Sequence, residues 1–336
     1  MREAEERSKE AARTIAKRRI TLGYPIDPMA DPNRTGLIGL KFSDITTTLG
    51  DPAAKRTSVN PGFAALCVAW LGDLGLNSGD RVAIAASGSF PGLIIAVLAA
   101  CETLNMEPVL VLSLGSSEYG ANIPELNAAQ MILELNKAGI LKTFPAALSL
   151  GGEKDRGESE FPGHETPGTL RALAAATGLP LLEPPEGVDA ITALKQGAEQ
   201  RLAVYFEGAE PKVFVNIGGG EVAFGSTSAS LRLPNGPITA TLSRYDDATR
   251  VEGRYRGLIF NFLERGIPVI HFLDIKGMAL RHGLPVDPVP FPEPGEAAFY
   301  RNGKTSKLPA ALGLAASFAL LFFVRLSRDK EEKGAP

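Results

Sequence analysis

The alternation of short apolar runs with longer amphipathic segments constrains the fold of this chain more than any other feature. The apolar runs have the length of β-strands, and the segments between them have the 3.6-residue period of α-helices. The runs span 37–42, 81–86, 107–115, 145–152, 212–220 and 267–274. Since strands joined through helices run parallel, we predict a doubly wound α/β domain with a mostly parallel sheet of about five or six strands.

The length and composition permit one large domain with additional segments at its ends. The chain has 336 residues, of which 44% are hydrophobic, so it can form a sizeable core. Residues 1–25 are strongly charged and lack the apolar stretch of a signal peptide, so they predict a solvated helix with paired charges. We expect a single α/β domain over 26–300.

The clearest change in composition comes near the C-terminus. The segment 308–324, LPAALGLAASFALLFFV, carries no charge, and a charged tail follows at 325–336. It predicts a transmembrane helix at the short end of the spanning range, and the alternative is an apolar core helix. Lysines and arginines flank the segment on both sides, so the charges leave its orientation in the membrane open.

Charge and residue counts argue against several classes of function. The formal net charge is −3 and no basic patch is interleaved with aromatic residues, so we expect no nucleic-acid partner. The only histidines are His164, His271 and His282, and their spacing fits no metal site. We therefore expect neither a bound metal nor a cofactor.

Loops rich in glycine and serine follow the predicted strands. They read SGSFPG, SLGSSEYGAN, SLGGEKDRG, NIGGGEVAFG and HFLDIKG. Ligands of open parallel sheets bind at the carboxyl ends of the strands, and exposed backbone N–H groups there favour anions. We predict an anion-accepting cleft formed by Asp44, Thr46, Thr47, Lys55, Arg56, Ser87, Gly88, Ser89, Ser116, Asn122, Asp155, Asn216, Gly218, Gly219 and Gly220.

The stretch AASGSFPG admits a catalytic and a structural interpretation. In the catalytic interpretation Ser87 or Ser89 acts as a nucleophile with His271 and Asp274, although the stretch lacks both glycines of the G-x-S-x-G elbow. It also lacks the Lys-Ser/Thr of a phosphate-binding loop. In the structural interpretation the serines cap the following helix and His271 belongs to the core.

Several of these segments together resemble the poly-gamma-glutamate system protein family. The resemblance rests on DPNRTGLIGLKFSDITTTLGDPAAKRTSVNPGFAAL, ASGSFPG, SLGSSEYGANIPE, LSLGGEKDRG and NIGGG, and it extends from about Ile26 to Asp274. It implies an accessory role in bacterial synthesis or export of poly-gamma-glutamate, and it transfers no catalytic residue.

The resemblance also implies partners and a location. The expected partners are other synthase or export subunits, the membrane, and the polymer or a glutamyl precursor. Members of the family usually begin with a hydrophobic segment, whereas this chain begins with a charged helix. With a second anchor the body would face outside the cell, and with the C-terminal anchor alone it could remain cytoplasmic. The alternative function is a serine hydrolase or acyltransferase acting on a gamma-glutamyl substrate.

Overall fold

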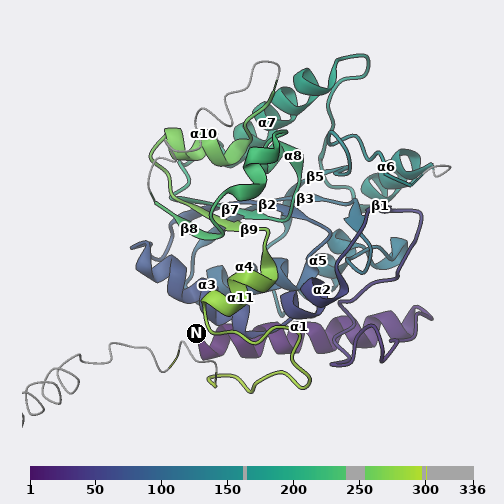
Figure 1. The fold of residues 1–336 in the computed structure, drawn as a ribbon, viewed down its shortest axis with the longest axis vertical. Coiled ribbons are helices and arrows are strands. Elements are labelled where there is room, and N and C mark those ends of the chain that lie inside the picture. Colours follow the sequence, from purple (N-terminus) through teal and green to yellow (C-terminus); the bar gives the residue numbers. More distant parts are fainter. Residues whose placement is uncertain (162–164, 240–253, 297–299, 301–336) are drawn as a thin grey trace, which may run out of the picture. The chain divides into compact units, whose positions relative to one another are not determined.

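The structure is a computed structural model that describes residues 1–161, 165–239, 254–296 and 300. Residues Met1–Ala297 form one compact unit, which includes the N-terminal helix. At its centre is a seven-stranded sheet in the order β6-β5-β3-β2-β7-β9-β8, parallel except for β8 (Figure 1). The predicted α/β class with a mostly parallel sheet is confirmed. Its strands are β2 (Arg81–Ser87), β3 (Glu107–Ser113), β5 (Pro145–Ser149), β6 (Leu181–Leu182), β7 (Val213–Ile217), β8 (Gly236–Ile238) and β9 (Val269–Phe272).

The sheet changes its direction of winding between β2 and β7. From β2 the chain adds β3, β5 and β6 on one side, and it then returns to add β7 and β9 on the other. Ala85 in β2 is therefore paired with Val111 of β3 and Asn216 of β7. Connections that leave β2 and β7 in opposite directions open a crevice at their carboxyl ends, where such sheets bind ligands.

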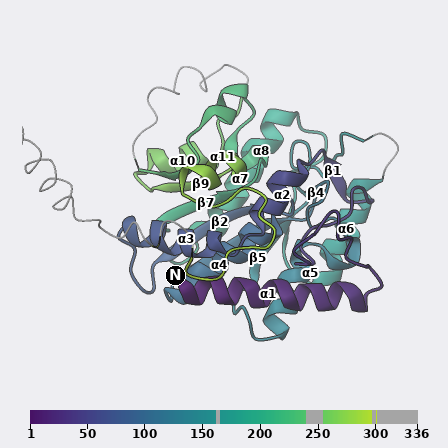
Figure 2. The ribbon, with the colours of Figure 1, turned by 60° about the horizontal axis from the view of Figure 1, so that its bottom comes forward.

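Two helical layers cover one face of this sheet, drawn below it in Figure 1. The inner layer contains α3 (Gly62–Asp73), α4 (Pro91–Thr103) and α5 (Ala128–Lys137). The outer helix α1 (Arg2–Thr21) lies along this layer in both views (Figure 2). Its Ala4, Ala11 and Ile15 are fully buried, so this strongly charged helix also has an apolar face that packs against the core.

The opposite face is covered by α7 (Ala190–Phe206), α8 (Glu221–Phe224) and α10 (Leu258–Glu264). Their apolar side chains form one cluster with the alternate residues of β2 and β7 that point to this side, such as Ala83 and Phe214. Around these layers lie α2 (Pro52–Ser58), α6 (Thr166–Thr177), α11 (Ile275–Arg281), and the 3₁₀ turns Pro124–Leu126 and Ser228–Arg232.

The first predicted strand, over 37–42, does not form. Backbone N–H and C=O groups of this segment form hydrogen bonds with a loop residue instead of with a strand. The Asn122 side chain accepts a hydrogen bond from the Leu40 N–H and donates one to the Leu40 carbonyl, at 2.8 and 2.9 Å. The actual strand, β1 (Thr46–Thr48), begins four residues after that run and pairs with β4 (Ser116–Ser117) outside the main sheet. An asparagine side chain offers the same donor and acceptor as a neighbouring strand, so an apolar run can be buried without joining a sheet.

The predicted transmembrane helix at 308–324 and the charged tail at 325–336 lie outside the described residues. Within the described part of the chain, no helix combines the length and the hydropathy needed to cross a bilayer.

Candidate functional site

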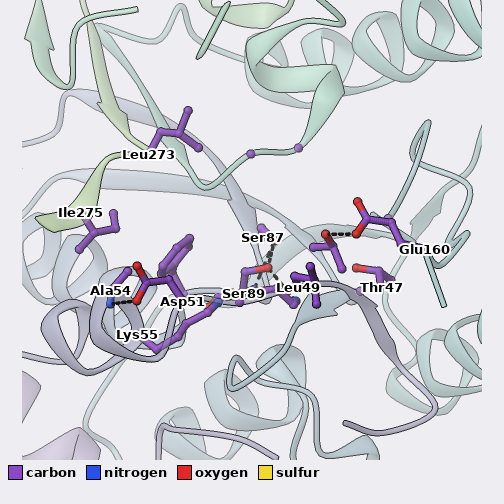
Figure 3. A pocket seen from close by; sticks show the side chains of 18 of the residues that line it. Thr47, Leu49, Asp51, Ala54, Lys55, Ser87, Ser89, Glu160, Leu273 and Ile275 are labelled. Atoms are coloured by element: carbon purple, nitrogen blue, oxygen red, sulfur yellow. Dashed lines mark hydrogen bonds between the residues drawn. The ribbon is translucent and has the colours of Figure 1, made fainter. Parts of the chain in front are cut away.

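A pocket of about 590 Å³ opens beside the carboxyl end of β2, at the switch point of the sheet (Figure 3). Residues from all five of the predicted glycine- and serine-rich loops contribute to its wall, together with the segment from β1 to α2. The lining residues are Thr47, Thr48, Leu49, Gly50, Asp51, Ala54, Lys55, Ser87, Ser89, Phe90, Gly115, Ser117, Gly152, Glu153, Glu160, Gly219, Gly220, Glu221, Leu273, Asp274, Ile275 and Lys276. The predicted convergence of these loops is confirmed, and the volume is typical of a small-molecule site.

Three serines form a connected set in this pocket. Ser87 ends β2, and its hydroxyl donates to Ser89 Oγ at 3.0 Å while it accepts from the Ser89 backbone N–H at 3.2 Å. Ser89 Oγ in turn accepts from the backbone N–H of Ser117 at 3.0 Å. The turn after β2 is thereby fixed to β4 before α4 begins at Pro91. No side-chain hydrogen bond caps that helix, so the serines stabilise the turn itself.

Lys55 lies beside these serines on the short helix α2. Asp51 caps this helix by accepting from the N–H groups of Ala53 and Ala54, which fixes the direction of the lysine. The Lys55 side chain is buried, at 2% exposed, and Nζ lies 2.6 Å from Ser117 Oγ and 4.1 Å from the centre of the Phe90 ring. Nζ also contacts the Ser89 carbonyl.

No carboxylate of the described residues lies within ion-pair distance of Lys55 Nζ. Burial alone therefore governs its protonation and lowers the pKa of Lys55 to about 7. A lysine in this state can be a neutral base or a cation near neutral pH, whereas an exposed lysine is always charged.

The pocket wall contains more carboxylates than lysines, and a cleft that accepts anions has no need of carboxylates in its wall. Three of the five acids have a cation close by, because Asp51 pairs with Lys276, Glu153 with Lys154 and Asp274 with Arg281. The other two are Glu160 and Glu221, which accept hydrogen bonds of 2.7 Å from the Thr48 hydroxyl and the Lys154 N–H. No cation of the described chain lies within ion-pair distance of either. Within the described residues, the pocket thus combines two carboxylates that have no cation partner with one buried amine, and Figure 3 places Glu160 and Lys55 at opposite sides.

Several predicted ligand-binding residues line this pocket. They are Thr47, Lys55, Ser87, Ser89, Gly219 and Gly220, and the candidate catalytic Asp274 lines it as well. Asp274 accepts a hydrogen bond from the Gly277 N–H at 3.0 Å, so it caps α11. Asp44 is exposed and is not among the lining residues.

Two charged residues predicted for the cleft point elsewhere. Arg56 follows Lys55 on α2, but it lines a different pocket and binds Asp287 with two hydrogen bonds of 2.6 and 2.7 Å. Successive helical residues differ by 100° in direction, so the two basic side chains diverge. Asp155 is buried in an ion pair with Arg201, and it contributes only to a small inner cavity of about 30 Å³.

Other predicted ligand-binding residues hold the loops together. Ser116 donates to the carbonyl of Gly88, Thr46 accepts from Asn122, and Asn122 bonds Leu40 as described above. Gly218 has a φ of +95° at the end of β7, and a Cβ there would lie 3.0 Å from the Cβ of Ser87. This position therefore needs glycine for both its backbone conformation and its close approach to β2. None of these residues lines the pocket at the carboxyl end of β2.

The structure does not bring His271 to the serines. In the sheet, His271 of β9 is paired with Asn216 of β7, which is paired with Ala85 of β2, so β7 separates it from the strand of Ser87. Neighbouring strands are about 4.8 Å apart, which puts two strand spacings, about 10 Å, between them. His271 is fully buried, its Nδ1 lies 2.9 Å from the side-chain nitrogen of Asn216, and burial lowers its pKa to about 4. A Ser-His-Asp arrangement is absent from the described residues, and the core interpretation of His271 agrees with its position.

Sequence reasoning missed several polar residues of the pocket. Ser117 lay in one of the expected loops but had no motif to distinguish it from Ser116. Glu160 belongs to the polar segment after β5, and Glu221 begins a four-residue helix. In the sequence, the only feature these residues share is that each lies in a segment that follows a predicted strand. Among the described residues, no group of three or more His, Cys, Asp or Glu side chains is arranged to hold a metal ion.

The fold and this site define a doubly wound α/β protein with a polar pocket at the switch point of its sheet. No family model matches the sequence, and no curated protein or solved structure is detectably similar to it. The resemblance to the poly-gamma-glutamate system family therefore stays a prediction.

Proposed function

We propose that this chain is a membrane-anchored accessory component of poly-gamma-glutamate synthesis or export, and that its pocket binds a gamma-glutamyl ligand. The sequence resemblance supports the pathway, and the apolar segment 308–324 supports the anchor. The observation that carries the binding role is the charge arrangement in the pocket at the carboxyl end of β2: Glu160 and Glu221 lack a cation, and Lys55 lacks a carboxylate, among the described residues.

This arrangement favours one form of the ligand. A polymer segment presents a series of carboxylates, which the acids of the pocket wall would repel. Free glutamate and the amino end of a gamma-glutamyl chain carry an ammonium as well as carboxylates. In the proposed complex the ammonium lies near Glu160 and Glu221, and the carboxylate lies on the side of Ser89, Ser117 and Lys55. Of the two expected ligands, the proposal thus favours a zwitterionic glutamyl precursor or chain end over the polyanionic polymer.

Isothermal titration calorimetry of the full chain in detergent tests the ligand. L-Glutamate and gamma-glutamyl-glutamate should bind, and glutarate, which has the same carboxylates but no amino group, should bind at least about 10-fold more weakly. The Glu160→Gln and Glu221→Gln variants should lose affinity for glutamate but not for glutarate. Glu158→Gln is a matched control, because Glu158 lies near Glu160 in the chain but outside the pocket wall.

Two results would contradict the proposal at different levels. Equal binding of glutarate and glutamate would remove the assigned ammonium site. Unchanged polymer output and surface retention after deletion of the gene would remove the role in the pathway. Co-purification with synthase subunits tests the proposed partners, and membrane fractionation with and without residues 308–324 tests the anchor.

A further inference from the structure

The Lys55 amine and the Ser117 hydroxyl form a close pair in the wall of the pocket at the carboxyl end of β2. Nζ and Oγ are 2.6 Å apart, both residues line the pocket, and the exposed fractions of the two residues are 2% and 5%. The two residues come from segments 62 positions apart in the chain, α2 and β4, and the turn at Ser89 holds them in place through its carbonyl and its hydroxyl. A hydroxyl within hydrogen-bond reach of an amine has the geometry of a nucleophile with its general base.

We infer that Ser117 is a nucleophile and Lys55 its general base, and that the pocket catalyses acyl transfer from an amide or ester whose acyl group carries an ammonium. This inference rests on the proposed function only in taking the pocket as the binding site. The ammonium requirement comes from the carboxylates of Glu160 and Glu221, which have no cation partner among the described residues. The acyl carbonyl would lie over Ser117.

The surroundings of Nζ accommodate both protonation states that a general base passes through. A neutral lysine has two N–H groups and one lone pair, and Nζ has three neighbours. The protonated amine donates to the Ser89 carbonyl and to Ser117 Oγ, and it lies over the Phe90 ring. After loss of one proton, the N–H groups still serve the Ser89 carbonyl and the Phe90 ring, and the lone pair can accept the Ser117 hydroxyl proton. Burial also lowers the pKa of Lys55 to about 7, so much of the amine is unprotonated at neutral pH.

The other charged groups near this pair do not offset the effect of burial on the protonation of Lys55. On α2 itself, Asp51 is paired with Lys276 of α11, and Arg56 is paired with Asp287. Asp274 caps α11 and lies beside Arg281. Glu160 and Glu221 lie in other parts of the wall, and the apolar ring of Phe90, the residue before α4, faces the amine.

The final acceptor of the acyl group is water or a second amine, and each proton passes through Lys55 Nζ. Lys55 Nζ takes the proton of Ser117 Oγ as Oγ bonds to the carbonyl carbon. The bond from that carbon to the leaving nitrogen or oxygen then breaks, and the leaving group takes the proton from Nζ. Water or an amine next attacks the acyl-serine, gives its proton to Nζ, and releases Ser117, which recovers its proton. The products are the free acid or a new amide, together with the leaving amine or alcohol.

Gamma-glutamyl-p-nitroanilide tests this step with the full-length protein. Release of p-nitroaniline should rise with pH through about 7, and peptide mass spectrometry of acid-quenched samples should find the gamma-glutamyl group on Ser117. Ser117→Ala and Lys55→Met should each lower the rate at least about 100-fold. Ser78→Ala, in an exposed turn before β2, is the control that should keep the full rate.

The assay distinguishes failure of the reaction from failure of binding. If wild-type protein binds glutamate but neither releases p-nitroaniline nor acquires an acyl group, the catalytic inference is overturned and the binding proposal stands. An acyl group on Ser87 or Ser89, or full activity in Ser117→Ala, also overturns it. The mapping uses the wild-type chain, so the result does not depend on the folding of a variant.

Discussion

Arg201 of α7 and Asp155 of the loop after β5 form an ion pair of 2.9 Å in the interior, where both side chains are less than 7% exposed. Arg201 also donates to Ser149 Oγ at the end of β5, at 2.7 Å, and to the Gly197 carbonyl, at 3.0 Å. The loop that carries Glu153 and Glu160 is therefore attached to the helix behind the sheet. This attachment explains why a polar insertion forms part of a pocket wall.

Removal of one partner of this pair should strongly destabilise the protein. Asp155→Ala leaves the Arg201 charge buried without compensation, which typically costs about 3–5 kcal/mol of unfolding free energy. Urea denaturation followed by circular dichroism measures the loss. Glu158→Gln, which removes an exposed partner of Lys154, should change stability by less than about 1 kcal/mol. Equal effects of the two variants would contradict the buried pairing.

His271 should make stability depend on pH in the acid range. Burial lowers its pKa to about 4 in the folded protein, against 6.5 in the unfolded chain, so the unfolded chain takes up a proton first as the pH falls. The contribution of the neutral His271 to the unfolding free energy is fully present above pH 6.5 and is lost as the pH falls to about 4. The unfolding free energy of the wild type should drop by about 3 kcal/mol more over this range than that of His271→Gln. Parallel pH profiles would show that the imidazole titrates normally.

Lys55 should have a similar effect in the alkaline range. Its pKa is lowered from 10.5 to about 7 in the folded state, so its contribution is present above pH 10.5 and is lost as the pH falls to about 7. Between pH 10.5 and 7, the wild type should lose up to about 5 kcal/mol relative to Lys55→Met. Denaturant titrations at several pH values measure this difference. A constant difference between the two proteins would contradict a neutral Lys55.

Two glycines should respond oppositely to substitution by alanine. A Cβ on Gly39 would lie 1.9 Å from the Gly120 carbonyl oxygen, so Gly39→Ala should destabilise the protein by about 2–3 kcal/mol. A Cβ on Gly72, inside α3, would meet no atom within 4 Å, and Gly72→Ala should stabilise the protein by about 0.5–1 kcal/mol. Thermal denaturation compares both variants with the wild type. A tolerated Gly39→Ala would mean that the 37–42 segment can move away from its loop partner.

The sequence alone determined the centre of the sheet. The strands β2, β3, β5, β7 and β9 were predicted because buried parallel strands are apolar on both faces, and their periodicity is visible locally. The edge strands β6 and β8 have two and three residues, too few to show a period. The convergence of five loops followed from the same pattern, since the carboxyl ends of parallel strands share one edge.

Only the tertiary structure decided what the individual side chains do. Lys55 and Arg56 are neighbours in sequence, yet one amine is buried next to Ser117 while the other side chain binds Asp287. The sequence places both His271 and Ser87 at predicted strands, but the strand order β2-β7-β9 keeps the two residues apart. Periodicity is a local property of the chain, whereas the pairing of two groups depends on strand order, helix direction and burial, which the fold sets over hundreds of residues.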